Sequence, residues 1–91
     1  MLRISLSGEI DIATHDELFD SIMTPLRHAG TLELVIDLHG VSFLDSGAVG
    51  ILVAGHNAAT QAECAYHILD PPEPVRRVLQ RTGVLDLLIG A

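Results

Sequence analysis

Val41-Ser42-Phe43-Leu44-Asp45-Ser46-Gly47-Ala48-Val49-Gly50-Ile51-Leu52 is the stretch that decides the fold. The preceding residues 34–38 are almost continuously apolar and of strand length, which is typical of a strand buried on both faces of an α/β sheet. Residues 41–44 carry this strand to the edge of the sheet. Asp45 and Ser46 then form an N-cap pair for a helix expected over about residues 47–62. The stretch therefore predicts a strand, a polar turn and a helix in direct succession.

Ser46 places a hydroxyl group at the start of that helix. Free amide groups and the helix dipole favour negative charge at this end, so a phosphate on Ser46 is compatible with the helix. The simpler interpretation is that Asp45 and Ser46 only cap the helix, because both residue types are preferred at helix starts. The residues of the junction leave both interpretations open.

The other segments alternate between strand and helix patterns. A period-two pattern predicts a strand over residues 2–6, interrupted at residues 7–9, and Thr14 with Glu17 predicts a capping box before a helix. A strand is expected over residues 64–69, a helix from Glu73, and a final edge strand over residues 84–89. Each glycine inside a helix costs about 1 kcal/mol relative to alanine, so Gly50 and Gly55 indicate close packing.

The composition describes a small acidic chain with an aliphatic core. Its 91 residues, 48% hydrophobic and 3% aromatic, predict a single domain over residues 1–91. The formal net charge of −7 argues against nucleic-acid binding and favours a protein partner with a basic face. No run reaches the length of a membrane span and the N-terminus has no signal-peptide pattern, so we expect a cytoplasmic protein without membrane insertion.

The residue types that carry enzyme chemistry are not spaced for it. The five histidines include no pair at metal-ligand spacing on one helix turn, and the single Cys64 cannot complete a thiolate site. Leu44 and Ala48 stand where a Gly-x-Ser-x-Gly motif around Ser46 would need glycines. We therefore expect a binding module rather than an enzyme, with no catalytic residue, cofactor or metal.

Four segments in order resemble the STAS domain, the fold shared by bacterial anti-sigma factor antagonists and the cytoplasmic tails of sulfate transporters. They are residues 4–11 (ISLSGEID), 34–38 (LVIDL), 41–50 (VSFLDSGAVG) and 81–86 (RTGVLD). The resemblance implies an α/β fold, a STAS-like mixed β-sheet with helices packed on it, here lacking the family's first strand and last helix. Such a loss would uncover a sheet edge and an apolar face, which a homodimer or a strand exchange would cover.

The resemblance also implies where the functional surface lies. In antagonists of this family an Asp-Ser pair is followed by a second hydroxyl residue, the usual phosphoacceptor. Gly47 stands at that position, so either Ser46 has taken over phosphorylation or this chain is not switched by it. The turn ending at Asp11 would share a rim with Asp45 and Ser46. The partner-binding residues implied are Asp11, Thr14, Asp45, Ser46, Gly47 and Ala48.

The function implied by the resemblance is that of an anti-sigma factor antagonist-like module that regulates transcription. It would sequester an anti-sigma factor that is also a serine kinase of the histidine-kinase-like ATPase type, and so free a sigma factor. A serine phosphatase would remove the phosphate. The alternative is a structural STAS subunit of a signalling or transport complex that is not phosphorylated, which Gly47 favours. A third hypothesis is nucleotide or small-anion binding at the Ser46 helix start.

Overall fold

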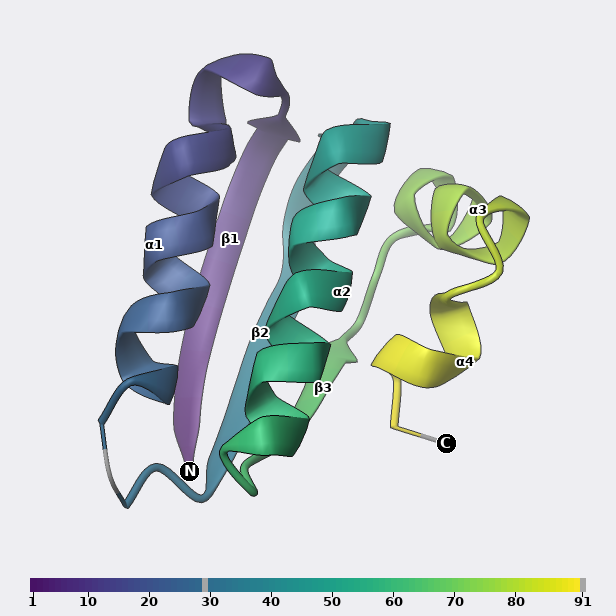
Figure 1. Cartoon of the computed structure of the whole chain (residues 1–91). Helices are drawn as coiled ribbons and strands as arrows, with labels where there is room; N and C mark the ends of the chain where they lie inside the picture. Colours follow the sequence, from purple (N-terminus) through teal and green to yellow (C-terminus); the bar gives the residue numbers. More distant parts are fainter. Residues whose placement is uncertain (29, 91) are drawn as a thin grey trace.

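A parallel three-stranded sheet forms the centre of the computed structural model, which describes residues 1–28 and 30–90 (Figure 1). The strands are β1 (Leu2–Ile10), β2 (Glu33–Leu44) and β3 (Ala65–Leu69), in the spatial order β1-β2-β3. The helices are the short 3₁₀ helix η1 (Ile12–Thr14) and the α-helices α1 (His15–Leu26), α2 (Ser46–Gln61), α3 (Glu73–Arg81) and α4 (Leu85–Leu88). The α/β class is therefore confirmed.

The strands run parallel because a helix connects each strand to the next. α1 links β1 to β2 and α2 links β2 to β3, and such crossovers return the chain to the same end of the sheet. The expected sheet was mixed, whereas all strand pairs among residues 1–28 and 30–90 are parallel. Antiparallel neighbours are often joined by a hairpin, and no two strands of this part of the chain are joined by one.

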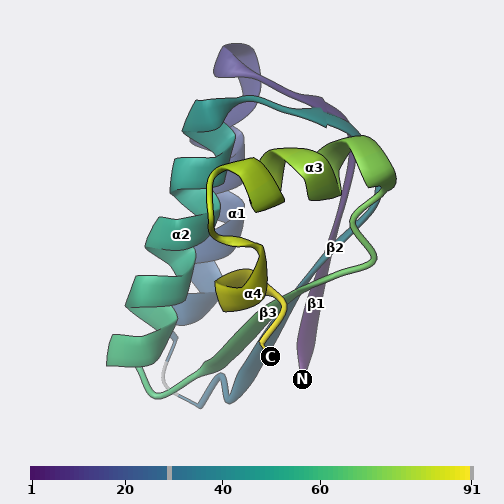
Figure 2. The ribbon, with the colours of Figure 1, turned by 90° about the vertical axis from the view of Figure 1, so that its right-hand side faces the viewer.

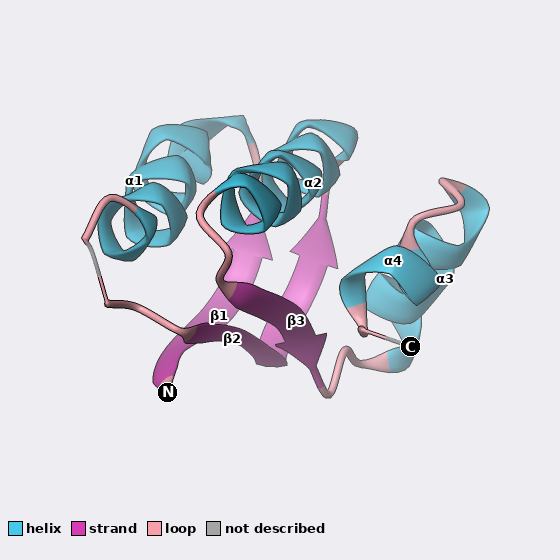
Figure 3. Cartoon of the chain, turned by 60° about the horizontal axis from the view of Figure 1, so that its bottom comes forward, coloured by secondary structure: helices cyan, strands magenta, loops and turns pink. Residues whose placement is uncertain are grey.

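The helices lie in two groups around the sheet. α1 and α2 lie side by side on one face, whereas α3 and α4 lie beyond β3 (Figures 2 and 3). β3 pairs only with residues 33–37 of β2, and α3 packs against β2. β2 is therefore central, with Leu34, Ile36 and Leu38 completely buried.

Residues 84–89 form a helical turn, so the expected edge strand is wrong. Leu85 and Leu88 are both buried, at 6% and 0% exposure. Residues three apart lie on the same side of a helix but on opposite faces of a strand, so only the helix buries both side chains. The amide of Val84 donates to the carbonyl of Leu79, which fixes the turn from α3 into α4.

Two further expectations about local structure are corrected. β1 continues through residues 7–9 to Ile10, because Gly8 adopts a φ of +78° and the register with β2 shifts there. Thr14 makes no side-chain cap bond to α1, because its hydroxyl pairs with Asp11 in the capping box of η1.

The central helix confirms close packing at one glycine and not at the other. A Cβ on Gly55 would lie 2.6 Å from the hydroxyl oxygen of Tyr66 and 2.7 Å from Cγ2 of Ile22. A Cβ on Gly50 would meet nothing within 4 Å, so the packing expected there is absent. Cys64 is buried and unpaired, as a single cysteine must be. None of the helices in residues 1–28 and 30–90 is both long and apolar enough to span a membrane.

Candidate functional site

Two turns meet at the end of the sheet where β1 and β2 stop. Ile10 and Leu44 are register partners in the parallel pair, and Asp11 and Asp45 follow them directly. The amide of Asp45 donates to the carbonyl of Ile10 at 3.2 Å, so the turns are joined through the backbone. They lie at the top of Figure 1, where β1 leads toward α1 and where α2 begins. We call residues 11–15 together with residues 45–47 the rim.

The first turn of the rim is held by a reciprocal pair of hydrogen bonds. Oδ1 of Asp11 accepts from the amide of Ala13 at 3.0 Å, and Oγ1 of Thr14 accepts from the amide of Asp11 at 3.1 Å. The Thr14 hydroxyl also donates to the Asp11 carbonyl oxygen at 3.1 Å. Asp11 and Thr14 therefore shape the turn, and Ile12 between them is left 83% exposed.

The second turn is tied to the first by a hydrogen bond between His15 and Asp45 that the sequence did not predict. Oδ1 of Asp45 accepts from the amide of Ala48 at 2.8 Å and caps α2. His15 Nε2 lies 2.7 Å from Oδ1 and 3.0 Å from Oδ2 of the same carboxylate. The hydrogen bond from His15, followed by that from the Ala48 amide, holds the pKa of Asp45 below its ordinary value. Asp45 is therefore ionised, and it fixes the spacing of the two turns.

Gly47 is where the two turns come closest. A Cβ on Gly47 would clash with Cε1 of His15 and lie 3.0 Å from Nε2 and 3.1 Å from Nδ1. The imidazole therefore fills the space that a side chain at residue 47 would need. This explains why glycine stands at the position where the resemblance implied a hydroxyl residue. Gly47 was the sequence feature that could have pointed to a close contact here, but a glycine does not show which distant residue fills the space beside it.

The remaining expected site residues divide by exposure. Ser46 is exposed at the first turn of α2, and its hydroxyl makes no hydrogen bond within the described part of the chain. Ala48 is completely buried beneath the same turn, so it cannot contact a partner directly. Its role is to donate its amide to Asp45, because the third residue of a capped helix faces the cap. The exposed surface of the second turn is thus formed by Ser46 and Gly47.

Two exposed apolar side chains beside the acidic residues were also missed. Ile12 is 83% exposed within the rim, and Phe43 at the end of β2 is 47% exposed. Phe43 is the register partner of Glu9, which is exposed as well. Apolar side chains surrounded by polar ones are typical of a protein-binding surface. The short apolar run over residues 41–44 gave no reason to expect Phe43 in solvent.

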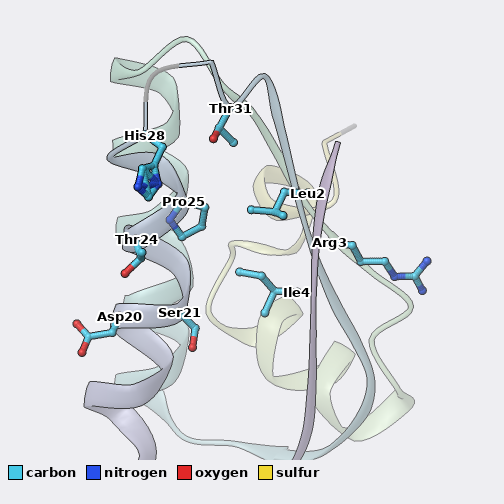
Figure 4. A pocket seen from close by; sticks show the side chains of 9 residues that line it. All are labelled: Leu2, Arg3, Ile4, Asp20, Ser21, Thr24, Pro25, His28 and Thr31. Carbon is cyan, nitrogen blue, oxygen red and sulfur yellow. The ribbon is translucent and has the colours of Figure 1, made fainter.

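A groove lined by β1 and α1 lies away from the rim. It has a volume of about 730 Å³ and runs between β1 and α1. In Figure 4, Leu2 and Ile4 point toward α1 and Arg3 points to the other side of the sheet. The lining residues are Leu2, Arg3, Ile4, Asp20, Ser21, Thr24, Pro25, His28 and Thr31. None of them belongs to the rim. No cluster of three or more His, Cys, Asp or Glu side chains suited to a metal ion occurs in the residues described above.

Several anti-sigma factor antagonists are similar to this chain over most of its length. Anti-sigma-B factor antagonists from Staphylococcus aureus (strain NCTC 8325 / PS 47) and Staphylococcus epidermidis are each 32% identical over 86 residues, which cover 94% of this chain and 79% of the relative. The crystal structure of an anti-sigma factor antagonist from Mycobacterium paratuberculosis is 32% identical with a TM-score of 0.82, covering 96% of this chain and 72% of that one.

A second solved structure and a family model agree with these similarities. The unphosphorylated form of the anti-sigma factor antagonist SpoIIAA has the same fold, with a TM-score of 0.82 at 24% identity over 96% of this chain and 75% of that one. A family model described as "Mlab, STAS domain" matches residues 1–89. The rim, the parallel sheet and these matches lead to one conclusion: the chain belongs to the STAS domain family.

Proposed function

We propose that this protein is an anti-sigma factor antagonist that docks through the rim. The observation that carries the proposal is the joining of both turns into one surface, with the exposed Ile12 between the partly exposed Asp11 and Asp45, in a chain 32% identical to anti-sigma-B factor antagonists. By occupying an anti-sigma factor, the protein frees the sigma factor that the partner would otherwise hold. The function is therefore binding, without a catalytic step.

The chemistry of the surface defines the partner. Ile12 and Phe43 offer apolar contact area, and Glu9, Asp11 and Asp45 add negative charge around it. Such a surface fits a partner with an apolar pocket bordered by basic side chains. We propose an anti-sigma factor with a histidine-kinase-like ATPase fold, which also acts as a serine kinase.

Ser46 is the hydroxyl available to such a kinase. It is exposed, and a phosphate there would add up to about two negative charges beside the ionised Asp45. The start of α2 accommodates this charge, so the fold persists, whereas the bulk of the phosphate, its like-charge repulsion with Asp45 and the cost of desolvating it oppose docking. A serine phosphatase would restore binding.

A matched pair of substitutions tests the docking surface. Ile12 and Leu32 are apolar residues of similar exposure, 83% and 76%, and lie at opposite ends of the parallel sheet. We expect Ile12→Asp to weaken binding to the anti-sigma factor by about tenfold or more, the loss of a typical hot-spot residue, and Leu32→Asp to leave it unchanged. The measurement is titration calorimetry with purified candidate anti-sigma factors. Equal binding by both variants would exclude the rim as the docking site.

The second candidate function is that of a structural STAS subunit without phosphorylation. Gly47 and the imidazole that occupies its side-chain space favour it, because the usual acceptor hydroxyl is missing. Incubation with the anti-sigma kinases and ATP, followed by intact mass measurement, distinguishes the two functions. Phosphorylation lost in Ser46→Ala supports the switch, and the absence of both phosphate and binding supports the structural subunit.

A further inference from the structure

We propose that His15 is a phosphoacceptor, modified at Nδ1. The proposal deepens the function proposed above and rests on it only for the origin of the physiological phosphoryl group, a nucleoside triphosphate bound to the partner. The chemistry of the acceptor is carried by the side chains of the rim themselves.

The first step is that Asp45 fixes which nitrogen of His15 is the nucleophile. An ionised carboxylate only accepts hydrogen bonds, so Nε2, 2.7 Å from Oδ1 and 3.0 Å from Oδ2, carries the proton. The lone pair of the neutral ring is then on Nδ1. A ring nitrogen oriented by a neighbouring group is a recurrent feature of covalent catalysis.

The second step is that Nδ1 can be reached. Nδ1 of His15 makes no hydrogen bond within residues 1–28 and 30–90. The side-chain atom that is both buried and without a hydrogen-bond partner in these residues is Nδ1 of His56, so Nδ1 of His15 is not buried. The His15 side chain is 23% exposed. Gly47, against which the ring packs, has no side chain that could extend over the imidazole.

The third step concerns the charge that modification adds. Phosphorylation forms a bond between Nδ1 and the γ-phosphorus while the bond from that phosphorus to the β-phosphate oxygen breaks, and its electron pair leaves with the nucleoside diphosphate. Nε2 keeps its proton, so the ring becomes a phosphorylated imidazolium whose positive charge faces the Asp45 carboxylate.

The surroundings act on the phosphate in opposite directions. The first amides of α1 carry no side-chain cap and favour a negative group, because Thr14 is engaged with Asp11. Asp16 and Glu17 in the same turn oppose it, but both are exposed and their repulsion is screened by salt. The attraction between Asp45 and the phosphorylated imidazolium acts at hydrogen-bond distance, and both side chains are only partly exposed. This attraction therefore outweighs the repulsion from Asp16 and Glu17.

A test without any partner protein decides the proposal. The whole chain is incubated with phosphoramidate, a small phosphoryl donor that modifies histidine, and the modified residues are identified by mass spectrometry at neutral pH. We expect His15 to react about tenfold faster than the exposed His28 and His39 in the same molecule, the factor that one charge-assisted hydrogen bond supplies. Because the histidines compete within one folded chain, a misfolded variant cannot confuse the result.

Asp45→Asn provides the matched variant, since asparagine still caps α2 but no longer holds the proton on Nε2. It should reduce the rate at His15 to that of His28. The proposal would be overturned if the histidines of the wild type were phosphorylated at equal rates, or if the rate at His15 were undiminished in Asp45→Asn.

A second arm connects the site to the proposed function. With the anti-sigma kinase and ATP, a phosphate on His15 is lost in mild acid, whereas a phosphate on Ser46 survives. An acid-labile phosphate that disappears in His15→Gln supports the proposal, and an acid-stable phosphate alone counts against it. Failure to bind any such kinase would contradict the proposed function, and the phosphoramidate rates would still decide the chemistry of His15.

Discussion

The pairing of His15 with Gly47 makes residue 47 unable to carry a side chain. We expect Gly47→Ser to lower the free energy of unfolding by about 1–3 kcal/mol, the usual cost of overpacking, because its Cβ overlaps the imidazole. The double variant Gly47→Ser with His15→Ala should recover most of this loss. Urea unfolding measures both, and Gly50→Ser is the control, since nothing lies within 4 Å of a Cβ there. If Gly47→Ser is as stable as Gly50→Ser, the imidazole does not occupy this space.

The two carboxylates with perturbed pKa values predict how stability depends on pH. The hydrogen bond from Arg3, at 2.6 Å, lowers the pKa of Asp37, and the hydrogen bond from His15 lowers that of Asp45. A carboxyl group whose pKa is lower in the folded state stabilises the fold at pH values above its ordinary pKa. This contribution is lost as the pH falls through the folded pKa.

We therefore expect the urea midpoint to be constant near neutral pH and to fall below about pH 4, where unfolded carboxylates begin to take up protons. Asp45→Asn should have a flatter profile in acid, because its cap remains and its titration is removed. Asp16→Asn, at an exposed position with no hydrogen bond from its side chain in the described residues, is the control and should follow the wild type. Parallel profiles for all three proteins would contradict the assignment to Asp45.

The element that best separates local from tertiary effects is α2. Gly50→Ala should raise the free energy of unfolding by up to about 1 kcal/mol, because alanine favours the helix and its Cβ has open space. Gly55→Ala should lower it by about 1–3 kcal/mol, because Tyr66 and Ile22 occupy that space and the cost of overpacking exceeds the gain in helix propensity. Thermal or urea unfolding checks both signs, and equal signs would show that packing does not distinguish the two glycines.

Elements with signals in their own sequence could be predicted, and those that depend on distant residues could not. The apolar run of β2 and the Asp45 cap of α2 are local patterns, and both were confirmed. α4 was missed because a short, mostly apolar segment such as residues 84–89 fits either a strand or a helix until the burial of Leu85 and Leu88 decides. The His15–Asp45 pair was missed because its members are 30 residues apart and meet only when β1 and β2 pair in register.

At the scale of the whole molecule, β1 is an edge strand among the described residues, and the 730 Å³ groove runs beside it under α1. The homodimer expected from the sequence stays a prediction, and this edge is where we expect it to form. Leu2 lines the groove and is 44% exposed, whereas Phe19 is 39% exposed outside it. Analytical ultracentrifugation should show a dimer that Leu2→Lys dissociates and Phe19→Lys leaves intact. A monomer at all concentrations would contradict the prediction.

The net charge of −7 gives the molecule a negative field that should accelerate docking onto a basic partner. Salt screens this field over about 8–10 Å, so a charge matters most when it lies at the contact itself. We expect the association rate with the anti-sigma factor to fall with rising salt. Asp11→Asn, which keeps the cap of η1, should bind more slowly at low salt and depend less on salt.

Glu63→Gln removes the same charge after the far end of α2 and should behave as the wild type. Stopped-flow association rates over a salt series separate the two variants. Because only position differs between them, equal salt slopes would mean that the partner responds to the total charge of the molecule, and docking would then have to be sought away from the rim.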